Sequence, residues 1–134
     1  MLDHALESAF VAFLGADSAF ADVHLFTGHE DEEHQLPAVT TSSKSESLAG
    51  SAAVFRADVT LLIESEAHDS EPDDHAALVE KVRAWLANKA AVVAVINAGN
   101  QVRLYGYAFT GSSLDVDGKR FCTSLTLKAG YGVP

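Results

Sequence analysis

Hydrophobic and polar residues alternate over one stretch near the middle of the chain. From residue 55 the odd positions are apolar while most even positions are polar, and the apolar set is Phe55, Ala57, Val59, Leu61 and Ile63. Side chains of a strand point alternately to opposite faces, so the pattern predicts a strand over residues 55–64 with one buried face. After a polar turn, apolar residues recur at helical spacing at Leu78, Val82, Trp85 and Leu86. This spacing predicts an amphipathic helix packed on the sheet.

The first forty residues predict one helix and two short strands. The helix has an apolar stripe and can end at Gly15; the stripe is Leu2, Leu6, Phe10, Phe13 and Leu14. Residues 23–27 predict a short strand that ends at Gly28, and the acidic residues that follow predict a surface loop. Residues 36–41 predict a second strand, which Pro37 confines to an edge or to its first positions.

Three further segments complete the predicted order. The serine-rich residues 41–51 predict a mobile hairpin loop, and the apolar residues 90–98 fit a helix or a buried strand equally well. Residues 102–110 and 121–128 predict a hairpin, with turn residues at Gly111-Ser112-Ser113 and Asp117-Gly118. The sequence therefore predicts a single α+β domain over residues 1–134. Its mainly antiparallel β-sheet packs with an N-terminal helix and a central amphipathic helix in two layers.

Composition is consistent with one self-sufficient core. The chain has 134 residues, of which 48% are hydrophobic, enough for a core without a metal or a disulfide. Cys122 is the only cysteine, so it cannot form an internal disulfide, and its place in a predicted strand favours a structural role. No apolar run approaches the roughly 20 residues of a membrane span, and the first residues carry no basic signal region, so we expect a soluble protein without membrane contact.

The net charge of −10 conceals an asymmetry along the chain. Residues 1–80 hold seventeen acidic residues against two basic ones, a balance of −15, whereas residues 81–134 hold seven basic residues against two acidic ones, a balance of +5. The basic residues of the second part are scattered rather than clustered. They fit a solvated mixed surface better than a nucleic-acid site.

Histidine and acidic residues suggest two metal sites, and neither has convincing spacing. His29 and His34 flank an acidic run, but they are five residues apart rather than the four of a helical zinc site. A second cluster contains His68, Asp69, Asp73, Asp74 and His75. Acidic residues beside Pro72 are typical of a helix start, where they complement the helix dipole. We therefore expect helix capping there and no metal or cofactor.

The motifs of covalent and nucleotide chemistry are missing from the sequence. The chain has no Gly-x-Ser-x-Gly elbow and no glycine-rich phosphate loop, and the opening of a calcium loop at Asp115-Val116-Asp117-Gly118 is not continued. Arg103, Tyr105, Tyr107 and Phe109 suggest a base-stacking face, but the acidic total argues against nucleic-acid affinity at physiological salt. The sequence predicts that the protein is not an enzyme, and it favours binding or assembly.

The order and spacing of the elements resemble the tail terminator, or tail-completion, proteins in the neck of long-tailed bacteriophages. The resemblance spans almost the whole chain and carries no single signature motif. It begins with the N-terminal helix and short strand and continues through Leu36-Pro37-Ala38-Val39, a serine-rich loop with Leu48-Ala49-Gly50, the strand at residues 55–64, the helix at residues 75–86 and a last strand at residues 121–128.

This resemblance implies a structural virion protein that is assembled in the host cytoplasm. Members of the family are expected to form a ring, commonly a hexamer, that caps the tail tube and joins it to the head-closure, or connector, proteins. DNA passes through such a ring without tight binding. No catalytic residue is implied.

A head-to-tail ring needs two different complementary patches on each subunit, and the charge asymmetry offers them. The candidate interface residues are Glu30, Asp31, Glu32, Glu33, Arg103, Lys119 and Arg120. The alternative is a small α+β enzyme or a metal- or ligand-binding domain. Its pocket would use His24, His68 or His75 with nearby acidic residues.

Overall fold

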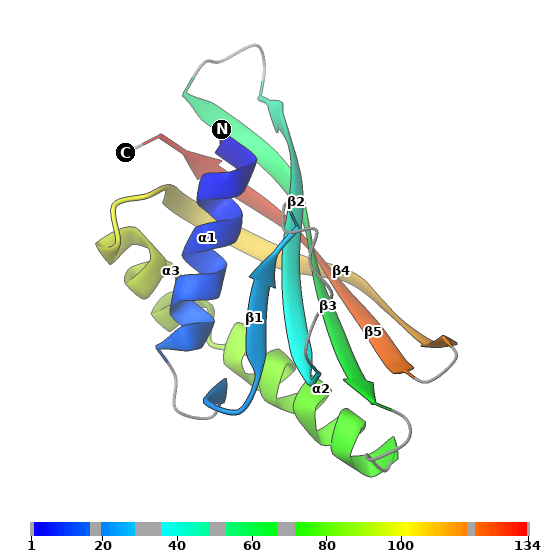
Figure 1. Ribbon diagram of the computed structural model, residues 1–134. Coiled ribbons are helices and arrows are strands. Elements are labelled where there is room, and N and C mark those ends of the chain that lie inside the picture. The colour runs from blue at the N-terminus through cyan, green and yellow to red at the C-terminus, as the bar shows by residue number, and fades with distance from the viewer. Residues whose placement is uncertain are drawn as a thin grey trace.

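The computed structural model describes residues 2–16, 20–28, 36–48, 53–66, 72–117 and 120–133. Within them the chain is an α+β domain with a mixed five-stranded sheet and three helices (Figure 1). The elements in chain order are α1 (Leu2–Gly15), β1 (His24–Thr27), β2 (Ala38–Ser47), β3 (Val54–Glu66), α2 (Pro72–Ala87), α3 (Lys89–Ala98), β4 (Arg103–Asp117) and β5 (Arg120–Gly132). The predicted α+β class and the central strand–helix unit are confirmed.

The sheet is built around β3, whose two neighbours run antiparallel to it. The strand order is β1-β2-β3-β5-β4, and only β1 and β2 pair in parallel, so the prediction of a mainly antiparallel sheet is correct for three of the four pairs. In the centre Leu61 lies opposite Thr41 on one side and Leu125 on the other. β1 and β4 are the two edges of the sheet.

All three helices contribute to one core on a single face of the sheet. The odd positions of β3 from Ala57 to Ile63 are buried as predicted, and they share a cluster with Leu6 and Phe10 of α1 and Val82 of α2. Trp85 on α2 packs against Phe13 of α1 with ring centroids 4.1 Å apart. The helices therefore form the second layer of the domain, as the sequence predicts.

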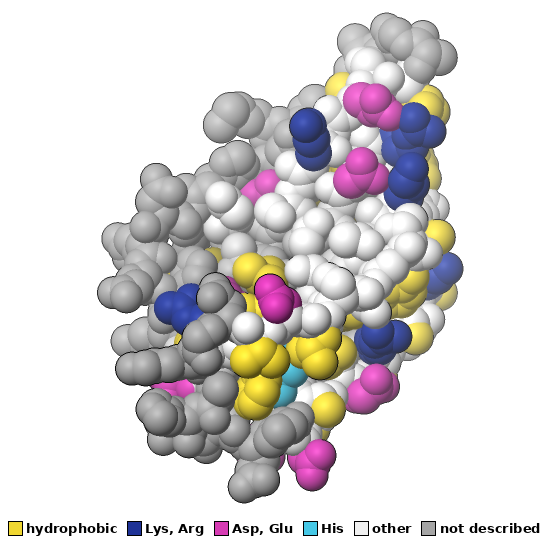
Figure 2. Space-filling view, turned by 90° about the vertical axis from the view of Figure 1, so that its right-hand side faces the viewer, with side chains coloured by type: hydrophobic (Ala, Val, Ile, Leu, Met, Phe, Trp, Pro, Cys, Tyr) yellow, Lys and Arg dark blue, Asp and Glu magenta, His cyan; other side chains and the backbone are white. Residues whose placement is uncertain are grey.

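The opposite face of the sheet is open and rich in hydroxyl groups. Thr60 on β3 lies opposite Ser42 on β2 and Thr126 on β5, and all three side chains are half-buried. Further along, Asp58 lies between Lys44 and Lys128 in the same register. Figure 2 shows this uncharged polar area with acidic and basic side chains interspersed above it.

The serine-rich segment after residue 41 is mostly strand, and the predicted loop at residues 41–51 is wrong up to Ser47. The inward-facing serines find polar partners beneath α1. Ser43 donates two hydrogen bonds to the buried Glu7 Oε2, from its backbone N–H at 2.8 Å and from Oγ at 3.2 Å. The Ser45 hydroxyl lies 2.6 Å from the Tyr131 hydroxyl. Because partners satisfy the polar groups of these half-buried serines, serine can occupy a core-facing strand.

The ambiguous apolar segment at residues 90–98 is the helix α3. Its buried residues are Val92 and Ile96, which are one helical turn apart. The Asn97 side chain ties this helix to β4, because its Oδ1 accepts from the Leu104 N–H at 2.6 Å and its Nδ2 donates to the Leu104 carbonyl at 3.1 Å.

The predicted turn at Gly111-Ser112-Ser113 is wrong, since β4 runs on to Asp117. Two register shifts between β4 and β5, at Leu104/Gly106 and at Phe109/Gly111, accommodate the extra residues. The hairpin instead reverses at the predicted Asp117-Gly118 position, between Asp117 and Arg120.

Truncating Leu61 tests the alternation of β3. Leu61→Ala should lower the free energy of unfolding by about 2–5 kcal/mol, because a fully buried aliphatic side chain is lost from the core. Thr60→Ala, on the open face of the same strand, is the matched control and should cost about 1 kcal/mol or less. The two values come from urea titrations. Equal losses would mean that the two faces of β3 are wrongly assigned.

Removing the buried carboxylate tests the polar contact between α1 and β2. Glu7→Ala should destabilise the domain by about 1–3 kcal/mol, because the Ser43 N–H loses its acceptor in a buried setting. Ser8→Ala on the same helix is the control, with an expected change within about 0.5 kcal/mol. A neutral Glu7→Ala variant in a thermal or urea titration would show that this contact contributes nothing.

Candidate functional site

The end of the β4–β5 hairpin is the most exposed apolar part of the described chain. We call residues 112–117 of β4 with residues 120–123 of β5 the hairpin tip. Leu114 and Val116 expose 67% and 57% of their surface there. Both face the same side of the sheet as the helices, since they lie opposite the inward Thr123 and Phe121. The apolar face of the sheet therefore continues beyond its helical cover.

The two ends of β4 are held differently. Near its start, Tyr107 is buried and its hydroxyl donates to the Leu86 carbonyl at the end of α2. Burial raises the pKa of Tyr107 to about 12. Near the hairpin tip, Arg83 of α2 donates a hydrogen bond to the Ser112 hydroxyl of β4 at 2.9 Å. The start of β4 belongs to the core, whereas its end projects from it.

A groove of about 310 Å³ separates the hairpin tip from α2. Figure 2 shows hydrophobic side chains gathered beside a histidine at the lower end of the molecule. The lining residues come from one helix and two strands and are His75, Ala76, Val79, Glu80 and Arg83 of α2, Ser112, Ser113, Leu114 and Val116 of β4, and Phe121 and Thr123 of β5. The groove has an apolar floor with charged groups on the helix side.

His75 is buried at the inner end of this groove. Its Nδ1 lies 2.9 Å from the Ser65 hydroxyl and its Nε2 lies 2.8 Å from the Thr123 hydroxyl. Its ring also contacts Phe121, with centroids 5.6 Å apart. Burial lowers the pKa of His75 below its usual 6.5, so the neutral ring is favoured. Both ring nitrogens are engaged by hydroxyl groups, so His75 joins α2 to the sheet.

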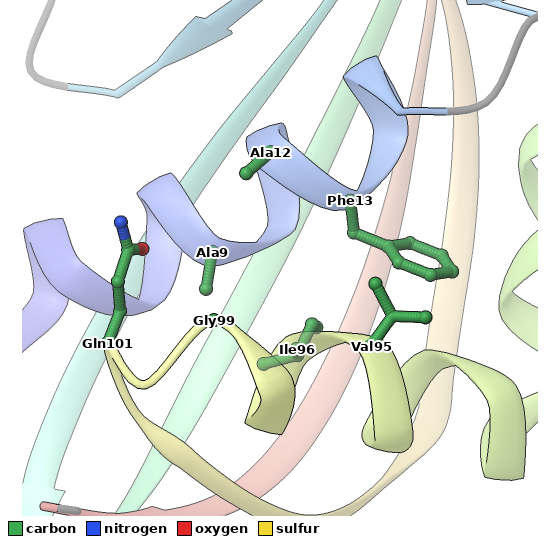
Figure 3. Close-up of a pocket in the computed structure, with 7 residues that line it drawn as sticks. All are labelled: Ala9, Ala12, Phe13, Val95, Ile96, Gly99 and Gln101. Atoms are coloured by element: carbon green, nitrogen blue, oxygen red, sulfur yellow. The ribbon is translucent and has the colours of Figure 1, made fainter.

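A second, smaller hollow lies between α1 and α3. It measures about 120 Å³ and is lined by Ala9, Ala12, Phe13, Val95, Ile96, Gly99 and Gln101. Figure 3 shows Ala9 and Ala12 of α1 pointing toward α3. Ala9, Ala12 and Gly99 have small side chains or none, so they leave this space between the two helices unfilled. Val95 stands at its rim with 47% of its surface exposed.

Of the sequence-predicted interface residues, the structure describes Arg103 and Arg120. Arg103 and Arg120 mark opposite ends of the hairpin, on the order of 45 Å apart at the rise of a strand. Arg103 is exposed, whereas Arg120 donates to Glu64 of the same chain at 3.0 Å. Lys119 and the acidic residues Glu30, Asp31, Glu32 and Glu33 lie outside the described residues.

Of the suggested metal and pocket residues, the structure describes His24, Asp73, Asp74 and His75. His29, His34, His68 and Asp69 lie outside the described residues, and His24 is exposed on β1. Asp73 and Asp74 are exposed in the first turn of α2, where their charge complements the helix dipole. Among the described residues no group of three His, Cys, Asp or Glu side chains could hold a metal ion.

Cys122, the single cysteine of the chain, is half-buried on β5. The described helices fall short of the length and hydropathy that a membrane span requires. Comparison with protein families and with curated proteins finds no match to this chain. Function is therefore inferred from the geometry and from the element order described above.

Glu7 was missed at the sequence level, and His75 was named there as a cluster and pocket candidate without its buried partners, although both residues occupy apolar stripes. Glu7 lies three residues before Phe10 on α1, and His75 lies three residues before Leu78 on α2. A polar residue at such a position must find a partner in the core, which is a signal that the sequence does carry. The exposed Leu114 and Val116 alternate with Ser113 and Asp115 and are readable as the apolar face of a strand.

The lowered pKa of His75 makes stability depend on pH. The unfolded chain binds more protons than the folded chain between the folded pKa and about 6.5, so stability is complete above this window and falls as the pH drops through it. His75→Gln should flatten this dependence. His24→Gln, at an exposed site on β1, should leave the dependence unchanged. Urea titrations from pH 7.5 to 5 measure both, and identical curves for wild type and His75→Gln would contradict the assignment.

Proposed function

We propose that this protein is a structural subunit of the neck of a long-tailed bacteriophage, of the tail terminator type. It forms a hexameric ring that caps the tail tube and joins it to the head-closure proteins. Its place is the virion, after assembly in the host cytoplasm. It works by binding other subunits rather than by catalysis.

The observation that carries this proposal is the exposed hairpin tip. Leu114 and Val116 lie on the sheet's edge strand, where an uncovered apolar surface would favour aggregation unless a partner covers it. An enzyme with a buried active site has no need of such a projection. A subunit that functions only in an assembly does.

The distribution of charge supports association through two different surfaces. Residues 81–114 contain four basic residues and no acidic one, and they include α3 and most of β4. Residues 1–80 are strongly acidic. Unlike patches on one subunit attract between neighbours and disfavour contacts between identical patches, which is the condition for a head-to-tail ring.

The alternative of a histidine-based pocket gains no support from the groove. His75 is the described histidine that lines it, and its two ring nitrogens already contact Ser65 and Thr123. A general base or a metal ligand needs a ring nitrogen available to its target. The acidic balance of the chain also favours a DNA conduit that interacts weakly, because each neutralised phosphate would add affinity.

Native mass spectrometry with sedimentation velocity tests the proposal. The purified protein, alone or with a tail tube protein, should form a closed oligomer of one size, about six subunits in a cyclic arrangement. It should bind duplex DNA only weakly at physiological salt, with little change in affinity between low and high salt.

Two outcomes would contradict the proposal. One is a monomer at all concentrations that also ignores tail tube and head-closure proteins. The other is tight, salt-dependent DNA binding, which would indicate a nucleic-acid-binding protein instead.

A further inference from the structure

We infer that the ring closes through insertion of the hairpin tip of one copy into the α1–α3 hollow of the next copy. Leu114 is the inserted side chain, and Ala9, Ala12 and Gly99 form the receiving walls. This contact deepens the ring assignment and rests on it. It names the two surfaces that meet and the residue at their centre.

The first support is a match of size and chemistry. Loss of one leucine side chain from a protein core opens about 150 Å³, and the hollow offers about 120 Å³ with a largely apolar lining. Leu114 exposes 67% of its surface and is the most exposed large hydrophobic residue of the described chain. An apolar knob and an apolar hole of similar volume are therefore present on the same molecule.

The fit is also reciprocal. The hollow has a shoulder at Val95, which is 47% exposed, and the hairpin tip has a groove beneath it lined by Val79 and Val116. When Leu114 enters the hollow, Val95 of the receiving copy lies over this groove. The exposed side chains of Val95 and Val116 are thus buried together, which adds apolar area to the contact.

Charge complementarity is the second support. Asp115 is exposed on the hairpin tip, immediately after Leu114. Arg103 is exposed two residues beyond Gln101 at the end of the hollow, and α3 and its flanks carry no acidic residue between Lys81 and Leu114. Asp115 alternates with Leu114, and Arg103 alternates with the buried Leu104, so both charged side chains lie on the open face of the sheet and not in the hollow. They favour the approach of unlike ends of two copies without forming a close ion pair at the apolar contact.

The contact has to form between molecules. β4 starts at Arg103 beside the hollow and ends at Asp117 in the hairpin tip, so its 15 residues span on the order of 50 Å. The tip cannot reach the hollow of its own chain. Because the two surfaces differ, each copy uses one surface toward each neighbour, and the arrangement is head-to-tail.

Two single variants separate the two halves of the contact. Leu114→Asp removes the knob at an exposed site, and Ala12→Trp fills the hollow from the exposed side of α1. Each should weaken self-association by about ten- to a hundredfold, as expected for losing one buried leucine. The controls are Leu48→Asp and Ala84→Trp, which place the same changes on other exposed positions. Circular dichroism and melting temperature verify that every variant is folded.

Mixing the two variants provides the decisive measurement. Leu114→Asp keeps a working hollow and Ala12→Trp keeps a working tip, so an equimolar mixture retains one productive contact per pair. Sedimentation should show 1:1 dimers in the mixture and monomers in each variant alone. A disulfide between Leu114→Cys of one copy and Ala12→Cys of another, in a Cys122→Ser background, should form only between chains.

The outcomes distinguish this contact from the ring itself. If wild type forms rings and both variants form them equally well, the contact is wrong and the proposed function stands. Wild-type rings with no dimer in the mixture would likewise overturn the tip-in-hollow contact. If wild type stays monomeric with every tested partner, the ring fails together with the contact.

Discussion

A mismatch of lengths governs the architecture. β4 has 15 residues and spans on the order of 50 Å, whereas α2 with 16 residues and α3 with 10 span about 24 Å and 15 Å. Each residue adds more than twice as much length to a strand as it adds to a helix. The helices therefore cannot cover the whole apolar face of the β4–β5 hairpin. At the tip, α2 lies across the groove beside β4 and leaves Leu114 and Val116 exposed.

Much of the fold is readable from the sequence because its signals are local. The alternation of β3 and the stripes of α1 and α2 depend on residues a few positions apart, and all three elements are found as predicted. The sequence predicts a strand only over residues 36–41, because the serines that follow look solvated. In the structure Ser43 and Ser45 of β2 bind Glu7 and Tyr131, which lie 36 and 86 residues away in the sequence. Such partners become visible only when the chain is folded.

The candidate site was less predictable for a related reason. The candidate interface residues were chosen from the sign of their charge. Arg120, however, donates a hydrogen bond to Glu64, which lies 56 residues away in the sequence. The aromatic residues of β4 do not share one face, because a register shift near Tyr105 leaves that side chain 57% exposed while Tyr107 is buried. A single extra residue in a strand reverses the orientation of everything beyond it. The amino-acid composition does not reveal this register shift.

The hydroxyl-bearing face of the sheet has a consequence for how copies of the domain can meet. Thr60, Ser42 and Thr126 place half-exposed hydroxyl groups, which water can hydrate, in a row across three strands, beside the alternating charges of Lys44, Asp58 and Lys128. Two such faces pressed together would have to shed this hydration without an apolar gain. Stacking into a β-sandwich is thereby disfavoured, so copies that associate would meet along the rim of the sheet rather than across its face.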